Sequence, residues 1–251
     1  MGENAVAQRR VGLFVTCLVD LMRPRIGFAA LKLLQHAGFE VIVPAEQTCC
    51  GQPGFNAGDA EAARALARKL IAEFERCDYL VIPSGSCAGT VKTHFPELFV
   101  ADPDWLARAE ALAAKTWELS RFLVEVAGMT DPPGRFEGRV TYHDSCSGLR
   151  ELGVKHAPRT LLARMPGVRL VEMPGCEECC GFGGSFAVKY GELSAAIATR
   201  KCDNIHASGV RTVVLGDLGC MLNIEGRLVR MGDRSTKVLH LAEVLAGMTQ
   251  S

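Results

Sequence analysis

The sequence predicts an α/β fold of two similar lobes, each a small parallel sheet flanked by helices and related to the other by internal duplication. Three observations support this prediction. The 251 residues are 48% hydrophobic, which suffices for one large core or two small ones. Short apolar runs alternate with amphipathic stretches, as in parallel sheets. A Cys-Cys-Gly segment occurs twice, at residues 49–51 and 179–181.

Each Cys-Cys-Gly segment is the centre of a wider cysteine pattern. One cysteine lies well before each pair and one lies well after it, and the second set repeats the first with a shift of 129 to 133 residues. Eight of the eleven cysteines follow this pattern and are candidate ligands for metal: Cys17, Cys49, Cys50, Cys87, Cys146, Cys179, Cys180 and Cys220. We interpret the pattern as a duplicated site for a soft metal.

The elements expected in the first half follow from hydrophobic periodicity and from helix boundary signals. Gly38 is a natural end for the first long helix, and Asp59 is a natural N-cap for the second. In chain order the predicted elements are strand 11–17, helix 24–36, strand 39–43, helix 59–75 and strand 79–83.

The second half predicts the same order of elements: strand 139–146, helix 157–165, strand 168–173, helix 191–207 and strand 210–215. Residues 101–127 read as helical with a break near Thr116, and the Pro-rich segment 130–135 reads as a linker. We therefore predict two lobes, residues 1–131 and 132–251. The tail at 237–248 predicts a short strand and a closing helix.

Every candidate ligand segment follows a predicted strand. Parallel α/β sheets form their binding crevices just beyond the carboxyl ends of the strands, so four cysteines distant in sequence can meet there. Several of the segments also precede a helix, whose N-terminal N–H groups stabilise thiolate and anionic groups. The sequence thus predicts one site in each lobe.

Composition excludes several classes of function. The chain has 28 basic and 28 acidic side chains, so no net charge attracts it to nucleic acid or to anionic lipid. We expect no signal peptide at residues 1–10 and no membrane span, which predicts a cytoplasmic location. Eleven cysteines in a reducing compartment favour metal binding or redox chemistry over disulfides.

Sulfur-only donor sets favour zinc or an iron-sulfur cluster. Structural zinc sites usually contain two Cys-x-x-Cys pairs, whereas the last cysteine of each set is followed three positions later by Thr90 or Asn223. Adjacent cysteines suit a four-iron cluster better than one tetrahedral ion. We predict one or two [4Fe-4S] clusters per chain, and zinc in one half stays an alternative.

These motifs resemble those of the lactate utilization protein A family, which is related to the B subunit of heterodisulfide reductase and to the iron-sulfur subunit of glycolate oxidase. The resemblance covers nearly the whole chain. It rests on segments 17–24, 48–53, 86–89, 178–184 and 219–226, which read CLVDLMRP, TCCGQP, SCAG, ECCGFGG and GCMLNIEG.

The resemblance implies an electron-transfer subunit of a three-protein L-lactate dehydrogenase system, without its own flavin or nicotinamide. No Gly-x-Gly-x-x-Gly segment stands between a strand and a helix, which agrees with that role. The closely spaced cysteines of ferredoxin-type domains are absent from the sequence. The other subunits, including a ferredoxin-type iron-sulfur protein, are therefore the expected partners.

Two other functions remain open at this stage. In the heterodisulfide reductase family each motif ends in a full Cys-x-x-Cys and supports disulfide reduction at the cluster. Thr90 and Asn223 remove that fifth cysteine here, so a thiol-disulfide reductase is the alternative enzyme. A zinc-stabilised scaffold for partner subunits is the alternative without catalysis or electron transfer.

The remaining cysteines and one histidine have simpler interpretations. Cys77 and Cys202 fall at or within predicted helices, where small buried apolar residues are expected. Cys176 lies three positions before Cys179, but the first half has Glu46 at the corresponding place. His143 ends a predicted strand near the second site, where it is either a buried polar residue or a partner for cluster sulfur.

Overall fold

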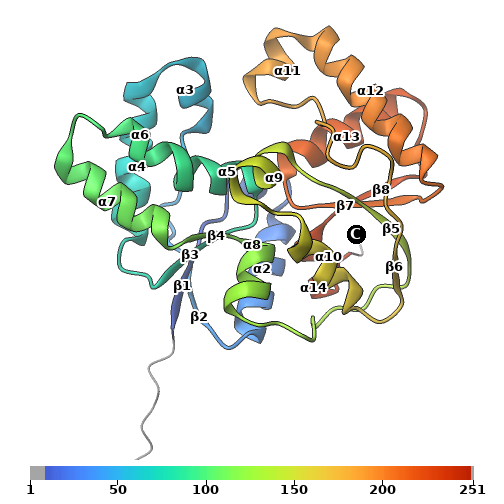
Figure 1. The fold of residues 1–251 in the computed structure, drawn as a ribbon, viewed down its shortest axis with the longest axis horizontal. Helices are drawn as coiled ribbons and strands as arrows, with labels where there is room; N and C mark the ends of the chain where they lie inside the picture. The colour runs from blue at the N-terminus through green and yellow to red at the C-terminus, as the bar shows by residue number, and fades with distance from the viewer. Residues whose placement is uncertain (1–8, 250–251) are drawn as a thin grey trace, which may run out of the picture.

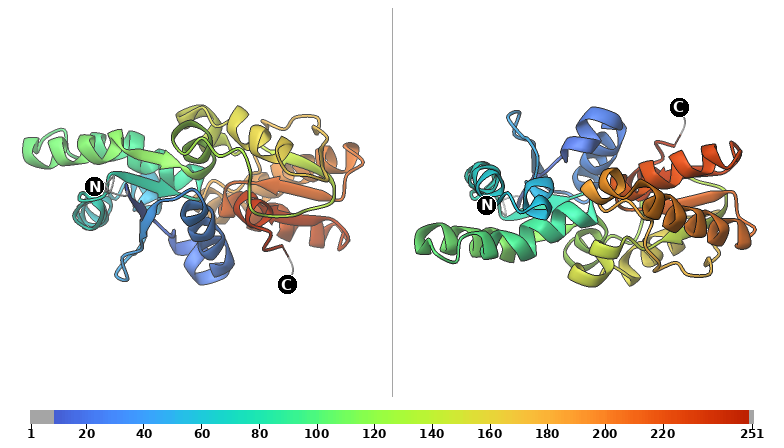
Figure 2. Two further views of the ribbon diagram at one scale, coloured as in Figure 1. Left: turned by 90° about the horizontal axis from the view of Figure 1, so that it is seen from below. Right: turned by 90° about the horizontal axis from the view of Figure 1, so that it is seen from above.

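The computed structural model describes residues 9–249 and contains two parallel sheets of four strands each. The two sheets lie side by side along the long axis of the molecule, with helices packed around both (Figures 1 and 2). The predicted fold class is therefore confirmed. The expectation of no signal peptide concerns mainly residues 1–8, which lie outside the described residues.

The first sheet has the strand order β2-β1-β3-β4. Its strands are short because each needs only three or four residues to cross the core of its lobe. They pair in parallel throughout, and their bounds are β1 Arg10–Leu13, β2 Glu40–Ile42, β3 Tyr79–Ile82 and β4 Thr116–Glu118.

The second sheet repeats this topology with the order β6-β5-β7-β8, again all parallel. Its strands are β5 Gly138–His143, β6 Val168–Leu170, β7 Thr212–Leu215 and β8 Lys237–His240. The central strands β1 and β5 correspond, and so do β3 and β7. The repeated cysteine pattern in the sequence thus matches a repeated sheet topology in the structure. The boundary near residue 132 stays a prediction.

The long helices α2, α4 and α12 lie where periodicity predicts them, whereas α13 and several short helices that begin at or near the cysteines were not predicted. Asp59 caps its helix by accepting a hydrogen bond from the N–H of Ala62. The first half contains α1 Cys17–Met22, α2 Pro24–His36, α3 Gln52–Ala57, α4 Ala60–Phe74, α5 Gly85–Gly89, η1 Thr90–His94, α6 Phe95–Leu98, α7 Pro103–Ala114, α8 Leu119–Arg121 and η2 Phe122–Val126. The second half contains α9 Cys146–Leu152, α10 His156–Ala163, α11 Ser185–Lys189, α12 Gly191–Ala207, α13 Leu218–Arg230 and α14 Leu241–Ala246.

The segment 101–127 differs from the expected broken helix. Helix α7 ends at Ala114, and the next residues form β4, which pairs with β3 as the fourth strand. The Thr116 hydroxyl donates to the carbonyl of Leu112 and turns the chain out of the helix. The break was therefore predicted at the right place, but the strand that occupies it was not predicted.

The two lobes share a continuous core. Buried side chains of both sheets, from Val11 in β1 to Val213 in β7, belong to one hydrophobic cluster. Helix α14 of the second lobe packs on α2 of the first, and α5 packs on α9. The last contact is so close that a Cβ on Gly85 would lie 2.9 Å from the Cα of Gly148. The lobes are thus held in fixed positions relative to each other.

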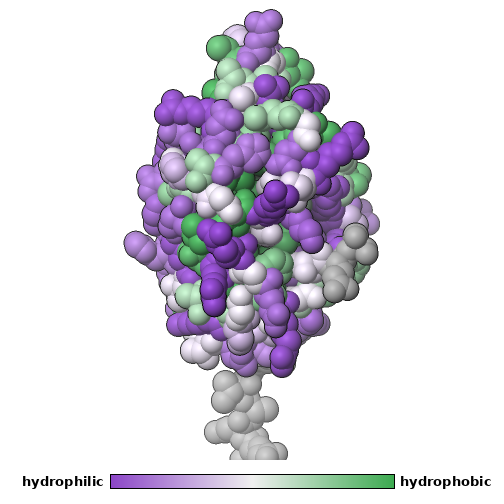
Figure 3. Space-filling model, turned by 90° about the vertical axis from the view of Figure 1, so that its right-hand side faces the viewer, coloured by the Kyte–Doolittle hydropathy of each residue, from purple (hydrophilic) through white to green (hydrophobic). Residues whose placement is uncertain are grey.

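The end of the molecule formed by the second lobe is mostly hydrophilic, with small apolar patches between the polar side chains (Figure 3). Within residues 9–249, none of the helices combines the length and the apolar character needed to cross a membrane.

Candidate metal centres

The first four cysteines meet beyond the carboxyl ends of β1, β2 and β3. Cys17 begins α1, the Cys49-Cys50 pair precedes α3, and Cys87 lies within α5. Their thiols form a chain of contacts from Cys17 to Cys49, then to Cys50, and from there to Cys87. The structure therefore brings together the whole predicted set of the first lobe.

Cys49 is the most acidic thiol of this set. Hydrogen bonds from the Cys17 and Cys50 thiols lower the pKa of Cys49 to about 2, and those two partners have raised pKa values in turn. The N–H of Gly51 also donates to the Cys49 sulfur at 3.4 Å. Cys49 is thus a thiolate at neutral pH, the form that binds metals.

The second four cysteines repeat this arrangement beyond β5, β6 and β7. Contacts link the thiols of Cys146, Cys179, Cys180 and Cys220 in the same order. Hydrogen bonds from Cys146 and Cys180 lower the pKa of Cys179 to about 2. Its sulfur accepts from the N–H of Gly181 at 3.3 Å.

Glycine after each pair is required by the backbone. Gly51 has φ +83° and Gly181 has φ +85°, a left-handed conformation that glycine adopts without strain. A Cβ on Gly181 would also lie 2.7 Å from the carbonyl oxygen of Ser194. The turn that aims the second cysteine inward, beside the first, therefore depends on glycine.

The chemistry of the two donor sets fits a soft metal. Each set offers four sulfur atoms and one stabilised thiolate, and neither set contains a carboxylate. Cys50, Cys180 and Cys220 are buried, while the other five thiols are partly exposed. Both sets can therefore hold a thiolate-bound metal centre.

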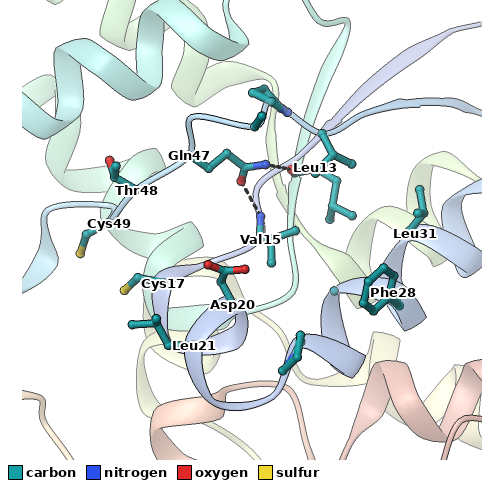
Figure 4. A pocket seen from close by; sticks show the side chains of 15 residues that line it. Leu13, Val15, Cys17, Asp20, Leu21, Phe28, Leu31, Gln47, Thr48 and Cys49 are labelled. Atoms are coloured by element: carbon teal, nitrogen blue, oxygen red, sulfur yellow. Dashed lines mark hydrogen bonds between the residues drawn. The ribbon is translucent and has the colours of Figure 1, made fainter.

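A cavity of about 540 Å³ opens beside the first set. Figure 4 shows Cys17 and Cys49 at one end of it and the apolar side chains of Phe28 and Leu31 at the other. The amide of Gln47 forms one wall, where it accepts from the N–H of Val15 and donates to the carbonyl of Leu13. The first site is thus accessible through an apolar pocket.

Two smaller cavities, of about 180 and 290 Å³, border the first and second cysteine sets. Phe182 and Asp217 line both of them. The ring of Phe182 packs closely against the backbone at Gly219, just before Cys220. A Cβ on Gly219 would lie only 2.7 Å from that ring. The two cysteine sets therefore face a common region between the lobes.

Asp217 links the ligand loops of the two lobes. One carboxylate oxygen accepts from the N–H of Ser86, beside Cys87, at 2.8 Å. The other accepts from the N–H of Gly219 at 3.1 Å and from that of Cys220 at 3.4 Å. This buried carboxylate thus connects the last ligand segment of one set to that of the other.

The second site is surrounded by buried polar and charged groups. His143 is fully buried at the end of β5, and its imidazole lies within 4.8 Å of the sulfurs of Cys180 and Cys220. Burial and the nearby Lys201 lower the pKa of His143 to about 3. The imidazole is therefore neutral at physiological pH.

Asp144 follows His143 and anchors a network of ion pairs. Its carboxylate accepts two hydrogen bonds from Arg159, at 2.8 and 2.9 Å, and a third from Lys155 at 3.2 Å. Arg159 also pairs with Glu172 at 2.6 Å, and Lys155 pairs with Glu177. These pairs fill the face of the second lobe that corresponds to the open pocket of the first.

The cysteines outside the repeat lie away from the thiol contacts. Cys77 and Cys202 are buried in the two hydrophobic clusters, as expected for small apolar residues. The sulfur of Cys176 lies 3.9 Å from the Lys155 ammonium and contacts none of the eight predicted ligands among the interactions of the described chain.

Sequence reasoning missed Asp144, Lys201 and Asp217. The sequence could have pointed to Asp217, since it is the one acidic residue between a buried strand and the last cysteine. Lys201 offers no such signal, because it lies on a largely polar helix and only packing against the Gly175 and Cys176 carbonyls buries it.

Comparison with known proteins adds the family. The model of a family described as "Cysteine-rich domain" matches residues 11–92 and 140–225, one copy in each lobe. "Lactate utilization protein A" of Geobacillus kaustophilus is 44% identical over 94% of this chain and 98% of its own length. The protein of that name from Oceanobacillus iheyensis is 43% identical over 94% of this chain and 96% of its own.

The chain belongs to the lactate utilization protein A family. The family resemblance predicted from the cysteine motifs is thereby confirmed. Among solved structures, a hypothetical protein from Helicobacter pylori has the same fold, with a TM-score of 0.62 at 12% identity. The match covers 97% of this chain and 49% of that one, so the present chain corresponds to about half of the larger protein.

Proposed function

We propose that this protein is the iron-sulfur electron-transfer subunit of an L-lactate-oxidising system and holds one [4Fe-4S] cluster in each lobe. The observation that carries the proposal is the convergence of two matched four-cysteine sets at equivalent edges of two sheets. Cys17, Cys49, Cys50 and Cys87 would hold one cluster, and Cys146, Cys179, Cys180 and Cys220 would hold the other. When bound, such a cluster supplies reversible one-electron transfer.

Thr90 and Asn223, which stand where a fifth cysteine would be needed, support sites of four cysteines. The Thr90 hydroxyl donates to the carbonyl of Ser86 within its own helix. The Asn223 amide donates to the carbonyl of Cys180 at 2.8 Å. Both side chains brace the ligand loops through backbone contacts and offer no thiol. This favours electron transfer over the reduction of disulfide substrates.

The residues between the two sites support electron exchange within the chain. Asp217 holds the loops of Cys87 and Cys220 together, and Phe182 fills the space beside them. Phe182 packs against the core that the two lobes share. The protein would thus fix the separation of the centres and exclude water from the innermost sulfurs.

Membership of the family supports a proposal for the substrate and the partners. The relatives are named for lactate utilization, and no residue described here is assigned to binding a hydroxy acid. We therefore propose that partner subunits oxidise lactate and that one of them is a ferredoxin-type iron-sulfur protein. We also propose a cytoplasmic location, because eleven cysteines in a chain of this kind suit metal binding in a reducing compartment.

Anaerobic purification followed by iron, acid-labile sulfide and zinc analysis tests the proposal. We expect a brown protein with iron and sulfide equivalent to two four-iron clusters per chain. A colourless protein with stoichiometric zinc and no acid-labile sulfide would contradict the proposal and would favour a zinc-stabilised scaffold.

A further inference from the structure

We propose that His143 donates a hydrogen bond to a sulfur of the metal centre in the second lobe and holds the reduction potential of that centre above that of the first. The inference rests on the proposed function, since it concerns the cluster that the second set of cysteines would hold. It adds a positioning residue and a direction of electron flow.

The position of His143 points to the metal centre. Its side chain is fully buried, and a ring nitrogen and the sulfurs of Cys180 and Cys220 all lie within 4.8 Å of one another. Neither ring nitrogen has a hydrogen-bond partner in the described structure. In the tautomer that carries its hydrogen on the nitrogen facing the sulfurs, the imidazole offers them an unused donor.

An unpaired donor of this kind is costly. A buried polar group without a partner destabilises a protein, and native structures rarely contain one without a reason. Thiolate and sulfide of a bound centre are negatively charged acceptors. A metal centre on these cysteines would therefore supply the partner that His143 lacks.

The other groups near His143 are already paired. The Lys201 ammonium donates to the carbonyls of Gly175 and Cys176 at 2.6 and 3.4 Å. The Asp144 carboxylate is held by Arg159 and Lys155. The Cys176 carbonyl also lies near the ring, but it already accepts from Lys201 and from the N–H of Asp144 at 3.1 Å. The sulfurs are the other acceptors close to the ring.

The first lobe has phenylalanine at the equivalent place. His143 pairs with Leu215 of β7, and Phe14, one residue beyond β1, stands in the same relation to the end of β3 because its N–H bonds the carbonyl of Val81. The Phe14 ring packs edge-on against Phe74 at 6.0 Å. It offers no hydrogen-bond donor to the first centre.

This difference sets the order of the potentials. Reduction adds negative charge to a cluster, and an N–H donor to sulfur stabilises that charge and raises the potential. The second centre has this donor, and the first has an aromatic ring instead. Electrons that enter the chain should therefore collect in the second lobe.

The test is a redox titration of the reconstituted full chain, followed by EPR, for the wild type and for His143→Phe. Phenylalanine is the residue at the equivalent place of the first lobe. We expect two wild-type signals with different midpoints. The variant should lower the higher midpoint by at least about 59 mV, a tenfold change in its one-electron equilibrium constant, and leave the other midpoint unchanged.

Nitrogen-15 labelling of histidine in the wild type gives an independent measurement. We expect a histidine nitrogen coupling on the higher-potential signal, absent in His143→Phe and retained in the control His240→Asn, which removes another buried histidine of the same lobe. If His143→Phe does not fold, the histidine nitrogen coupling in the wild type tests the inference by itself. The absence of that coupling would overturn the inference.

Unchanged midpoints in a folded His143→Phe variant would also overturn it. The failure of the proposed function is distinguishable from both results, because it would be visible already in the wild type as the absence of any iron-sulfur signal.

Discussion

The two lobes have the same strand order and the same four-cysteine set but very different surroundings. At the end of β1, beside the first site, Phe14 packs against Phe74, and an open pocket borders Cys17 and Cys49. Around the second site His143 and a charged network are buried. The comparison teaches that the four-cysteine sets repeat between the lobes while their surroundings differ.

The contrast is clearest on one face of each lobe. In the first lobe, Leu31 of α2 and Val43 after β2 line the open pocket. In the second, Arg159 of α10 and Glu172 after β6 form an ion pair on the corresponding face. The face of the first lobe thus has an open pocket that can accept an apolar group. The corresponding face of the second lobe is occupied by charged side chains.

The largest expected effect on stability comes from removing the ion pairs that Asp144 forms in the second lobe. Asp144→Asn removes the charge that pairs with Arg159 and Lys155, and the loss of one partner from a buried ion pair costs about 3–5 kcal/mol. Urea unfolding of the metal-free chain measures this cost. The control is Asp20→Asn beside the first pocket, where the exposed carboxylate has no ion pair in the described chain. Equal stabilities of the two variants would contradict a structural role for the network.

A somewhat smaller effect is expected from acid. Burial lowers the pKa of His240 to about 4, below its usual 6.5, so the stability from its neutral form is complete above pH 6.5. This stability is lost as the pH falls toward 4, by up to about 3 kcal/mol.

The variant His240→Asn tests the pH dependence. Asparagine is a favourable N-cap and can replace the acceptor that the His240 ring offers to the N–H of Ala242. Unfolding free energies between pH 7 and pH 4.5 should fall less steeply in the variant than in the wild type. If the unfolding free energies of both proteins fell equally with pH, the acid sensitivity would come from groups other than His240.

The smallest effect is expected at the open pocket. Phe28 is 62% exposed, and surface substitutions usually change stability by less than about 0.5 kcal/mol. Phe28→Ser should therefore leave the thermal midpoint nearly unchanged. A large loss of stability would show that the pocket is part of the core of the first lobe.

The sequence predicted which cysteines come together, and it predicted the long helices and most strands, because these depend on local signals. Pro24 and Gly38 bound one long helix, and the strands before the cysteines are short apolar runs. The strand β4 was missed because its three residues follow a helix without a turn signal. The burial of Lys201 and the bridge at Asp217 depend on contacts between distant segments, which the pattern of one chain does not encode.

Iron analysis of two matched variants, Cys50→Ser and Cys180→Ser, tests the two-site arrangement most directly. Both cysteines are buried and follow their partner in the adjacent pair, so the substitutions are equivalent in the two lobes. After anaerobic reconstitution, each variant should lose half of the iron and a different one of the two EPR signals. Loss of all iron in either variant, or loss of the same signal in both, would contradict two separate centres.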